Sequence, residues 1–100
     1  MQQVLSRVKD SLRITHDKFD ETVFSPMIES CRGDLLISGV AQKVAYDENH
    51  MLVERAIIHY CHINFPLGGD AKEIERHERT YSSLKNSLAM VGDDLSFKTF

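Results

Sequence analysis

A chain of 100 residues fits one domain, and a domain this small has a limited core, so association with other subunits would supplement its stability. The hydrophobic content of 42% and the charged content of 27% are ordinary for a globular protein and exclude a wholly disordered chain. A net charge of -3 supplies no basic surface for gripping phosphates, which argues against tight DNA binding by this chain alone.

Apolar residues at helical spacing predict two helices in the first part of the chain. The first is a short amphipathic helix of about ten residues, whose apolar positions are Val4, Leu5, Val8 and Leu12. The second is longer, because Phe19, Val23, Met27, Cys31 and Leu35 recur at intervals of four. It should end near Ser38-Gly39, since glycine just after the last apolar residue is a common left-handed helix stop.

Pro26 leaves two readings of this second helix open. Proline inside a helix removes a hydrogen bond and clashes with the preceding turn, so the helix could kink near Thr22. Alternatively, Ser25 caps a fresh start with Pro26 at the first helical position, and the sequence favours this second reading slightly.

The segment Met51 to Phe65 is predicted to be the buried central helix. Its apolar positions leave only a narrow polar seam, which Arg55, His59 and His62 form. It is too short and too charged to cross a bilayer, so the rest of the protein should cover it. The segment before it, Val40 to Tyr46, reads as a short connection that is too brief for a strand, and Asp47 or Asn49 should cap the helix.

A last helix is predicted from Ala71 to about Met90. Pro66 and the paired glycines Gly68 and Gly69 end the central helix, and Asp70 caps the last one. Apolar residues then recur at intervals of three and four, with charged residues on the other side; they are Ile74, His77, Tyr81, Leu84, Leu88 and Val91. Gly92 should stop this helix.

These elements predict an all-α fold, a small bundle of about four helices around a buried central helix, with an extended C-terminal tail. Residues 1–92 would form the helical domain and residues 93–100 the tail. The tail carries Phe97 and Phe100 without a helix long enough to bury them, so it either frays or docks on something else. Nothing near the start of the chain has the apolar core of an export signal.

Patterns that could support catalysis or metal binding have simpler explanations. Cys31 and Cys61 lie in apolar helical patterns, which indicates reduced, buried thiols rather than a disulfide. His59 and His62 share a helical face, but no second group of paired ligands accompanies them, so a polar seam facing solvent or a neighbouring subunit is expected. Neighbouring positions such as Cys61 and His62 point about 100° apart on a helix, which argues against a Cys/His nucleophile.

Two further patterns read as structural. Glu75 and Glu78 are interleaved with basic residues, as on any solvated helix face. Gly68-Gly69-Asp70 could seat an anion, but no lysine of a phosphate-binding loop comes after it, so a turn is expected. The sequence therefore predicts no enzyme, no cofactor and no metal site.

Four segments in order are similar to a known family: VKDSLRI, DLLISGV, LVERAIIHYCHINF and YSSLKNSLAMVGD. Together they resemble the head-tail connector family of tailed bacteriophages, over nearly the whole chain. The resemblance lies in ordered segments and helix lengths rather than in a chemical motif. Pro26 in the second helix and the tail after Asp94 depart from the family pattern.

The resemblance implies a structural virion protein that acts as an adaptor and in head completion after DNA packaging. Its subunits would form a homo-oligomeric ring, roughly dodecameric, beneath the portal protein in the neck between head and tail, after assembly in the host cytoplasm. The ring would extend the channel through which DNA passes without specific binding, and would dock the next neck, stopper or tail protein. It implies neither catalysis nor a cofactor, nor any contact with a membrane.

The residues agree with this implication in two respects. A channel through which DNA slides should not hold phosphates tightly, which suits an acidic chain with helix faces of mixed sign. A ring also needs interfaces in which one patch meets a different patch on the next subunit. The expected interface residues are Leu95, Phe97 and Phe100, with the two phenylalanines anchoring the tail on a neighbouring subunit or on the portal.

Two rival functions come from other classes. A small helical DNA-binding or regulatory phage protein would need a recognition helix rich in Arg, Asn and Gln, whereas Arg55 is the one arginine of the central helix. A metal enzyme built on the histidines would carry stoichiometric zinc or manganese, which elemental analysis would detect.

Overall fold

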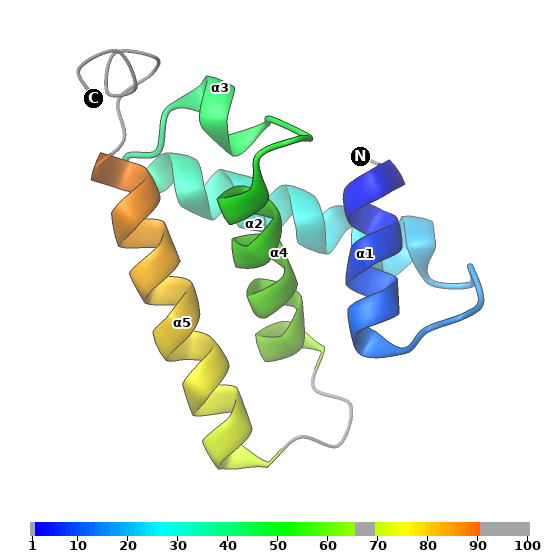
Figure 1. Cartoon of the computed structure of the whole chain (residues 1–100). Helices are drawn as coiled ribbons and strands as arrows, with labels where there is room; N and C mark the ends of the chain where they lie inside the picture. The colour runs from blue at the N-terminus through cyan, green and yellow to red at the C-terminus, as the bar shows by residue number, and fades with distance from the viewer. Residues whose placement is uncertain (1, 66–69, 91–100) are drawn as a thin grey trace.

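The computed structural model describes residues 2–65 and 70–90, and every regular element in these ranges is helical (Figure 1). The elements are α1 (Gln2–Leu12), the π-helical turn η1 (Asp20–Phe24), α2 (Ser25–Ile37), α3 (Gln42–Ala45), α4 (Met51–Asn64) and α5 (Ala71–Met90). The all-α prediction is confirmed. The described residues form five α-helices, one more than the predicted number of about four, because α3 was not expected.

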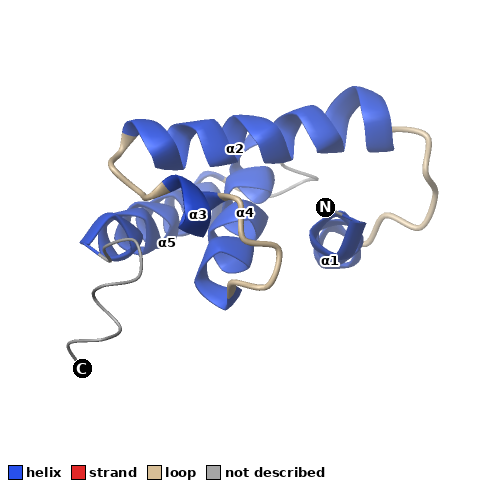
Figure 2. Cartoon of the chain, turned by 90° about the horizontal axis from the view of Figure 1, so that it is seen from above, coloured by secondary structure: helices blue, strands red, loops and turns tan. Residues whose placement is uncertain are grey.

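Helix α4 lies in the middle of the molecule, as the sequence predicts. Helices α1, α4 and α5 lie side by side, with α4 between the other two (Figure 1). Figure 2 shows α2 crossing this layer on one side. Val53, Ala56 and Ile57 of α4 are fully covered. Its first turn is not, because Met51 and Leu52 are exposed, so α4 is less enclosed than expected.

The core joins every helix of the described chain. Fully burying one Val, Leu, Ile or Phe side chain contributes about 1.5–3 kcal/mol, so a contiguous cluster is the main term that favours folding. Its buried members are Val4, Val8, Leu12, Phe24, Ile28, Cys31, Leu35, Val40, Val44, Ala45, Val53, Ala56, Ile57, Cys61, Tyr81 and Leu88. The two cysteines among them are free thiols, as predicted.

The helix around Pro26 differs in part from both predictions, the kink near Thr22 and the fresh start capped by Ser25. Helix α2 begins at Ser25 with Pro26 in its first turn, as favoured. No side chain caps this start, however, and Phe24 already has helical angles, with φ -75° and ψ -43°. The wide turn η1 runs directly into α2, and the Ser25 N–H donates to the Asp20 carbonyl five residues earlier. A π-helical turn thus accommodates the proline, which would clash with an ordinary α-helical turn before it.

Two helices end in the same left-handed motif. After α2, Gly39 has φ +100°, and the N–H groups of Gly39 and Val40 donate to the Leu36 and Leu35 carbonyls. This confirms the predicted stop. After α1, the N–H groups of Arg13 and Ile14 bond back to Asp10 and Lys9 in the same way, although Arg13 is not glycine and has φ 60°.

The segment 40–46 is not a plain connection, because it contains α3. Val40, Val44 and Ala45 are buried, which matches helical spacing over a run too short to identify from the sequence. The predicted caps of α4 are also wrong. His50 is the N-cap, and its ring Nδ1 accepts from the Val53 N–H at 3.4 Å, whereas Asp47 accepts from the Asn49 N–H within the loop.

Helix α5 agrees with its prediction in start and extent. The Asp70 carboxylate accepts from the Glu73 N–H at 2.8 Å, which is the expected cap. Tyr81 and Leu88 are buried, and Ile74, His77 and Leu84 are half-buried. Val91 and the predicted stop at Gly92 lie outside the described residues. Within residues 2–65 and 70–90, no helix is both long and apolar enough to span a membrane.

Candidate functional site

The three predicted interface residues, Leu95, Phe97 and Phe100, lie outside the part of the chain that the structure describes. The described chain ends with Met90, the last residue of α5, whose side chain is 85% exposed. Met90, at the C-terminal end of α5, is therefore the last described residue before the predicted tail.

Large apolar side chains are exposed at this end of the molecule. Helix α2 ends beside the last turns of α5, and α3 and the start of α4 lie at the same end (Figure 1). A Cβ on Gly39, after α2, would lie 3.9 Å from Ala89 Cβ of α5. Ile37 is 87% exposed and Met51 69% exposed. Ile37 is the last residue of α2, Met51 the first of α4 and Met90 the last of α5. We call these element ends the apolar end; the large apolar residues exposed there are Ile37, Tyr46, Met51, Leu52 and Met90.

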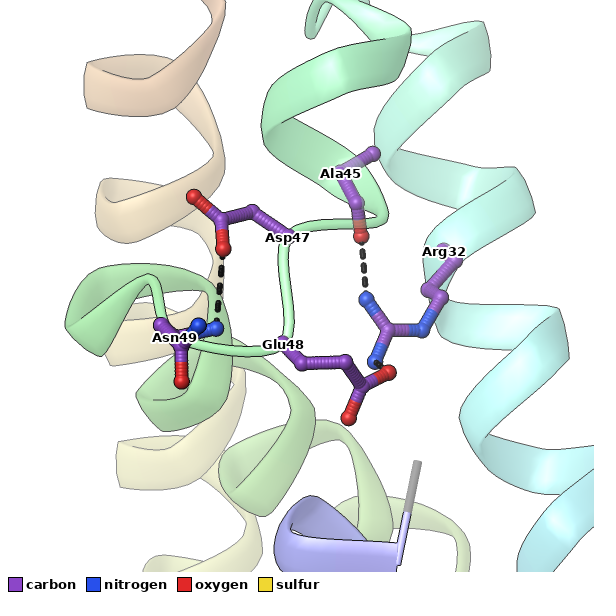
Figure 3. A network of polar contacts seen from close by, with 5 residues as sticks. All are labelled: Arg32, Ala45, Asp47, Glu48 and Asn49. Atoms are coloured by element: carbon purple, nitrogen blue, oxygen red, sulfur yellow. Dashed lines mark hydrogen bonds and ion pairs between the residues drawn. The ribbon is translucent and has the colours of Figure 1, made fainter.

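A buried arginine holds the loop between α3 and α4 in place (Figure 3). Arg32 of α2 is 1% exposed, and its guanidinium donates to the Ala45 carbonyl and to Glu48 Oε2, the latter at 2.9 Å. The Tyr46 ring also lies 5.5 Å from the guanidinium carbon. Because α3 is a single turn, these contacts fix the position of Tyr46 and of the chain that leads into α4.

The role of this arginine was not predicted from the sequence. Arg32 directly follows buried Cys31 and lies three residues before buried Leu35, which places it near the core face of α2. A charge at such a position indicates a buried partner. Its acceptors, Ala45 and Glu48, are thirteen and sixteen residues away, so spacing alone could not identify them.

The C-terminal half of α5 is bound to α2 through Asp34. The Tyr81 hydroxyl donates to Asp34 Oδ2 at 2.6 Å, and Lys85 Nζ lies 3.2 Å from the same oxygen. The hydrogen bond from Tyr81 and the ammonium of Lys85 lower the pKa of Asp34 below its ordinary value, against a smaller opposing effect of burial. Burial and the bond to Asp34 raise the pKa of Tyr81, so the phenol stays protonated.

Three histidines meet where α4 faces the N-terminal half of α5. His59 Nδ1 lies 2.9 Å from His77 Nδ1, and the rings of His62 and His77 stack with centroids 4.5 Å apart. His62 Nε2 lies 2.7 Å from Ser11 Oγ of α1. The two histidines of the predicted seam therefore contact two other helices of the same chain, which corrects for them the expectation of a seam facing solvent or another subunit, whereas Arg55 is exposed. His77, predicted only as one of the inward residues of the last helix, completes the group.

The environment of the seam favours neutral imidazoles. Burial lowers the pKa of His59, and the charges of His77, Arg55 and His62 lower it further. Burial and His77 also lower the pKa of His62, while Glu73 opposes this effect. Neutral rings can both donate and accept, as a contact between two ring nitrogens requires.

The geometry of the seam does not suit a metal ion. His62 is stacked nearly parallel to His77, at 21°, and its Nε2 is directed to Ser11, so the three rings do not aim nitrogens at one point. Within residues 2–65 and 70–90, no three His, Cys, Asp or Glu side chains are arranged to hold a metal. Burial raises the pKa of Cys31 and of Cys61 to about 12, so each thiol is protonated at neutral pH.

The charged face of α5 is solvated, as expected. Glu75 and Glu78 are exposed, and Glu75 forms an exposed ion pair with Arg79 at 3.0 Å. A hollow of about 570 Å³ is an open depression between α1 and the start of η1, where Lys9 and Asp20 pair at 2.9 Å.

Comparison of the chain with protein-family models, with curated proteins and with solved structures gave no match.

Proposed function

We propose that this chain is a structural subunit of the neck of a tailed bacteriophage, a head-tail connector that forms a ring beneath the portal. The ring would extend the DNA channel and dock the next neck or tail protein. The resemblance of four ordered segments to that family suggests this role, and the helical character of the described chain is compatible with it.

The observation that carries the proposal is the apolar end. Ile37, Met51 and Met90, at the ends of α2, α4 and α5, are 87%, 69% and 85% exposed, so a partner that covered them would gain the free energy of burying their side chains. A closed ring needs two different patches on each subunit. The apolar end supplies one patch, and Leu95, Phe97 and Phe100 of the tail after Met90 supply the second.

The tail can be tested by substitution in the full chain. Replacing Phe97 and Phe100 by Ser should leave the content of the described helices unchanged, since the last of them ends at Met90. It should reduce ring formation with the cognate portal, measured by native mass spectrometry and negative-stain imaging, because each buried Phe contributes about 1.5–3 kcal/mol.

The matched control is Thr99→Ser, which changes the same tail without removing an aromatic side chain. Truncation after Gly92 that left assembly and infectivity intact would contradict the role of the tail. A specific complex with DNA in a low-salt shift assay would instead favour the DNA-binding alternative over the connector.

A further inference from the structure

We propose that His59, His62 and His77 form a proton-sensitive joint, which attaches the N-terminal half of α5 to α4 at neutral pH and opens on acidification. The inference goes beyond the proposed function and does not depend on it. It concerns how the molecule comes apart, whatever its partners are.

The joint depends on which ring nitrogens carry protons. A bond between His59 Nδ1 and His77 Nδ1, 2.9 Å apart, needs a hydrogen on one nitrogen and a lone pair on the other. If both rings are protonated, both nitrogens carry hydrogens and both rings carry charge. The contact then becomes repulsive, and His62, stacked on His77, adds a third charge at 4.5 Å between centroids.

The groups around the joint give little compensation for added positive charge. Helix α4 contributes Arg55, whose charge acts on His59, and α1 contributes the Ser11 hydroxyl. On α5, Glu73, Arg76 and Thr80 line the same small hollow as His59 and His77, so one carboxylate and one guanidinium lie beside these two rings. Glu73 of α5 is the carboxylate that favours protonation of His62, and it does not outweigh burial and His77.

The direction of the pH effect follows from linkage. The pKa values of His59 and His62 are lowered below 6.5, so the open form binds protons more readily than the closed form. Stability from the joint is therefore fully present above pH 6.5 and is lost as the pH falls below it. The equilibrium constant for opening, the ratio of open to closed molecules, should rise about tenfold for each pH unit of acidification and for each extra proton that the open form binds.

The other end of α5 should stay attached over the same range. The pKa of Asp34 is lowered from 3.8, so its carboxylate remains ionised at pH 5 and keeps its bonds to Tyr81 and Lys85. Tyr81 and Leu88 are also buried in the core. Mild acid should therefore open α5 from one end rather than unfold the protein.

Hydrogen exchange of the full chain at pH 7.5 and pH 5.0, corrected for intrinsic exchange rates and recorded with EDTA, tests this inference. We expect protection in the second half of α4 and the first turns of α5 to fall about tenfold or more. Peptides covering residues 28–37 and 81–88 should keep their protection. Equal loss in all peptides, no loss, or opening by EDTA alone at pH 7.5 would overturn the proposal.

The variant His77→Gln removes the shared ring while keeping a neutral polar side chain, so it should reduce the difference between the two pH values. His16→Gln is the matched control, because His16 is exposed in the loop before η1 and should leave the difference unchanged. Imidazole NMR titration of the unaltered chain provides an independent readout. Midpoints for His59 and His62 at or above 6.5 would contradict the joint.

Discussion

Arg32 shows how one residue can determine the shape of a whole connection. A guanidinium that is 1% exposed loses its hydration, and this cost is offset only if its donors find acceptors. The Ala45 carbonyl and the Glu48 carboxylate serve this purpose, and both belong to the segment between α2 and α4. The side chain therefore holds in place a helix of four residues that could not persist alone.

We predict that Arg32→Met destabilises the protein by about 2–3 kcal/mol, because it removes the buried hydrogen bond to the Ala45 carbonyl and the ion pair with Glu48. Arg32→Lys should cost less, since it keeps the charge but loses the fork of two donors. Chemical denaturation followed by circular dichroism measures both changes.

Arg79→Met is the matched control for these variants. Its ion pair with Glu75 is exposed on both sides, at 72% and 69%, and such pairs contribute about 0–0.5 kcal/mol. If Arg32→Met were as mild as Arg79→Met, the buried contacts would not be what orders the loop.

At the scale of single elements, the two left-handed helix ends have different sequence signals. At the end of α2 the signal is Gly39, whose residue type predicts the helix end because glycine adopts φ +100° without strain. Arg13 performs the same function after α1 with φ 60°, and nothing in its type indicates this. The sequence thus predicts a stop only where the residue itself prefers the required geometry.

Substitution by alanine should change the free energy of unfolding in opposite directions at Gly39 and at Gly33. Gly39→Ala should destabilise the protein by about 1 kcal/mol, because alanine disfavours positive φ; its Cβ would meet Ala89 only at an ordinary distance of 3.9 Å. Gly33→Ala lies inside α2 with no atom within 4 Å of the new Cβ, so it should stabilise by about 0.5–1 kcal/mol. Urea unfolding of both variants measures this, and changes of the same sign would contradict it.

For the whole molecule, helical periodicity was sufficient to predict the class and the central position of α4. It identified α1, α4 and α5 because their apolar residues repeat over several turns. It could not find α3 or η1, which are short and depend on the packing around Arg32 and Pro26. The meeting of His59 with His77 depends on how α5 folds back on α4, which no local pattern encodes.

Apolar residues of two kinds can also be distinguished at the scale of the molecule. Ile57 and Leu88 are fully covered and contribute to folding, whereas Ile37 and Met90 are 87% and 85% exposed and contribute almost nothing to it. In the connector proposal these exposed residues have another use, because a neighbouring subunit or the portal would cover them.

We therefore predict that Ile37→Lys combined with Met90→Lys changes the free energy of unfolding by less than about 0.5 kcal/mol, because both sites are exposed. The pair should nevertheless weaken assembly with the portal at least about tenfold in Kd, since burial of one such side chain is worth about 1.5–3 kcal/mol. Ser83→Lys combined with Ser87→Lys adds the same two charges to the exposed face of α5 and serves as the control. If the Ile37/Met90 variant assembled as well as this control, the apolar end would not be an interface, and the connector proposal would lose the observation that carries it.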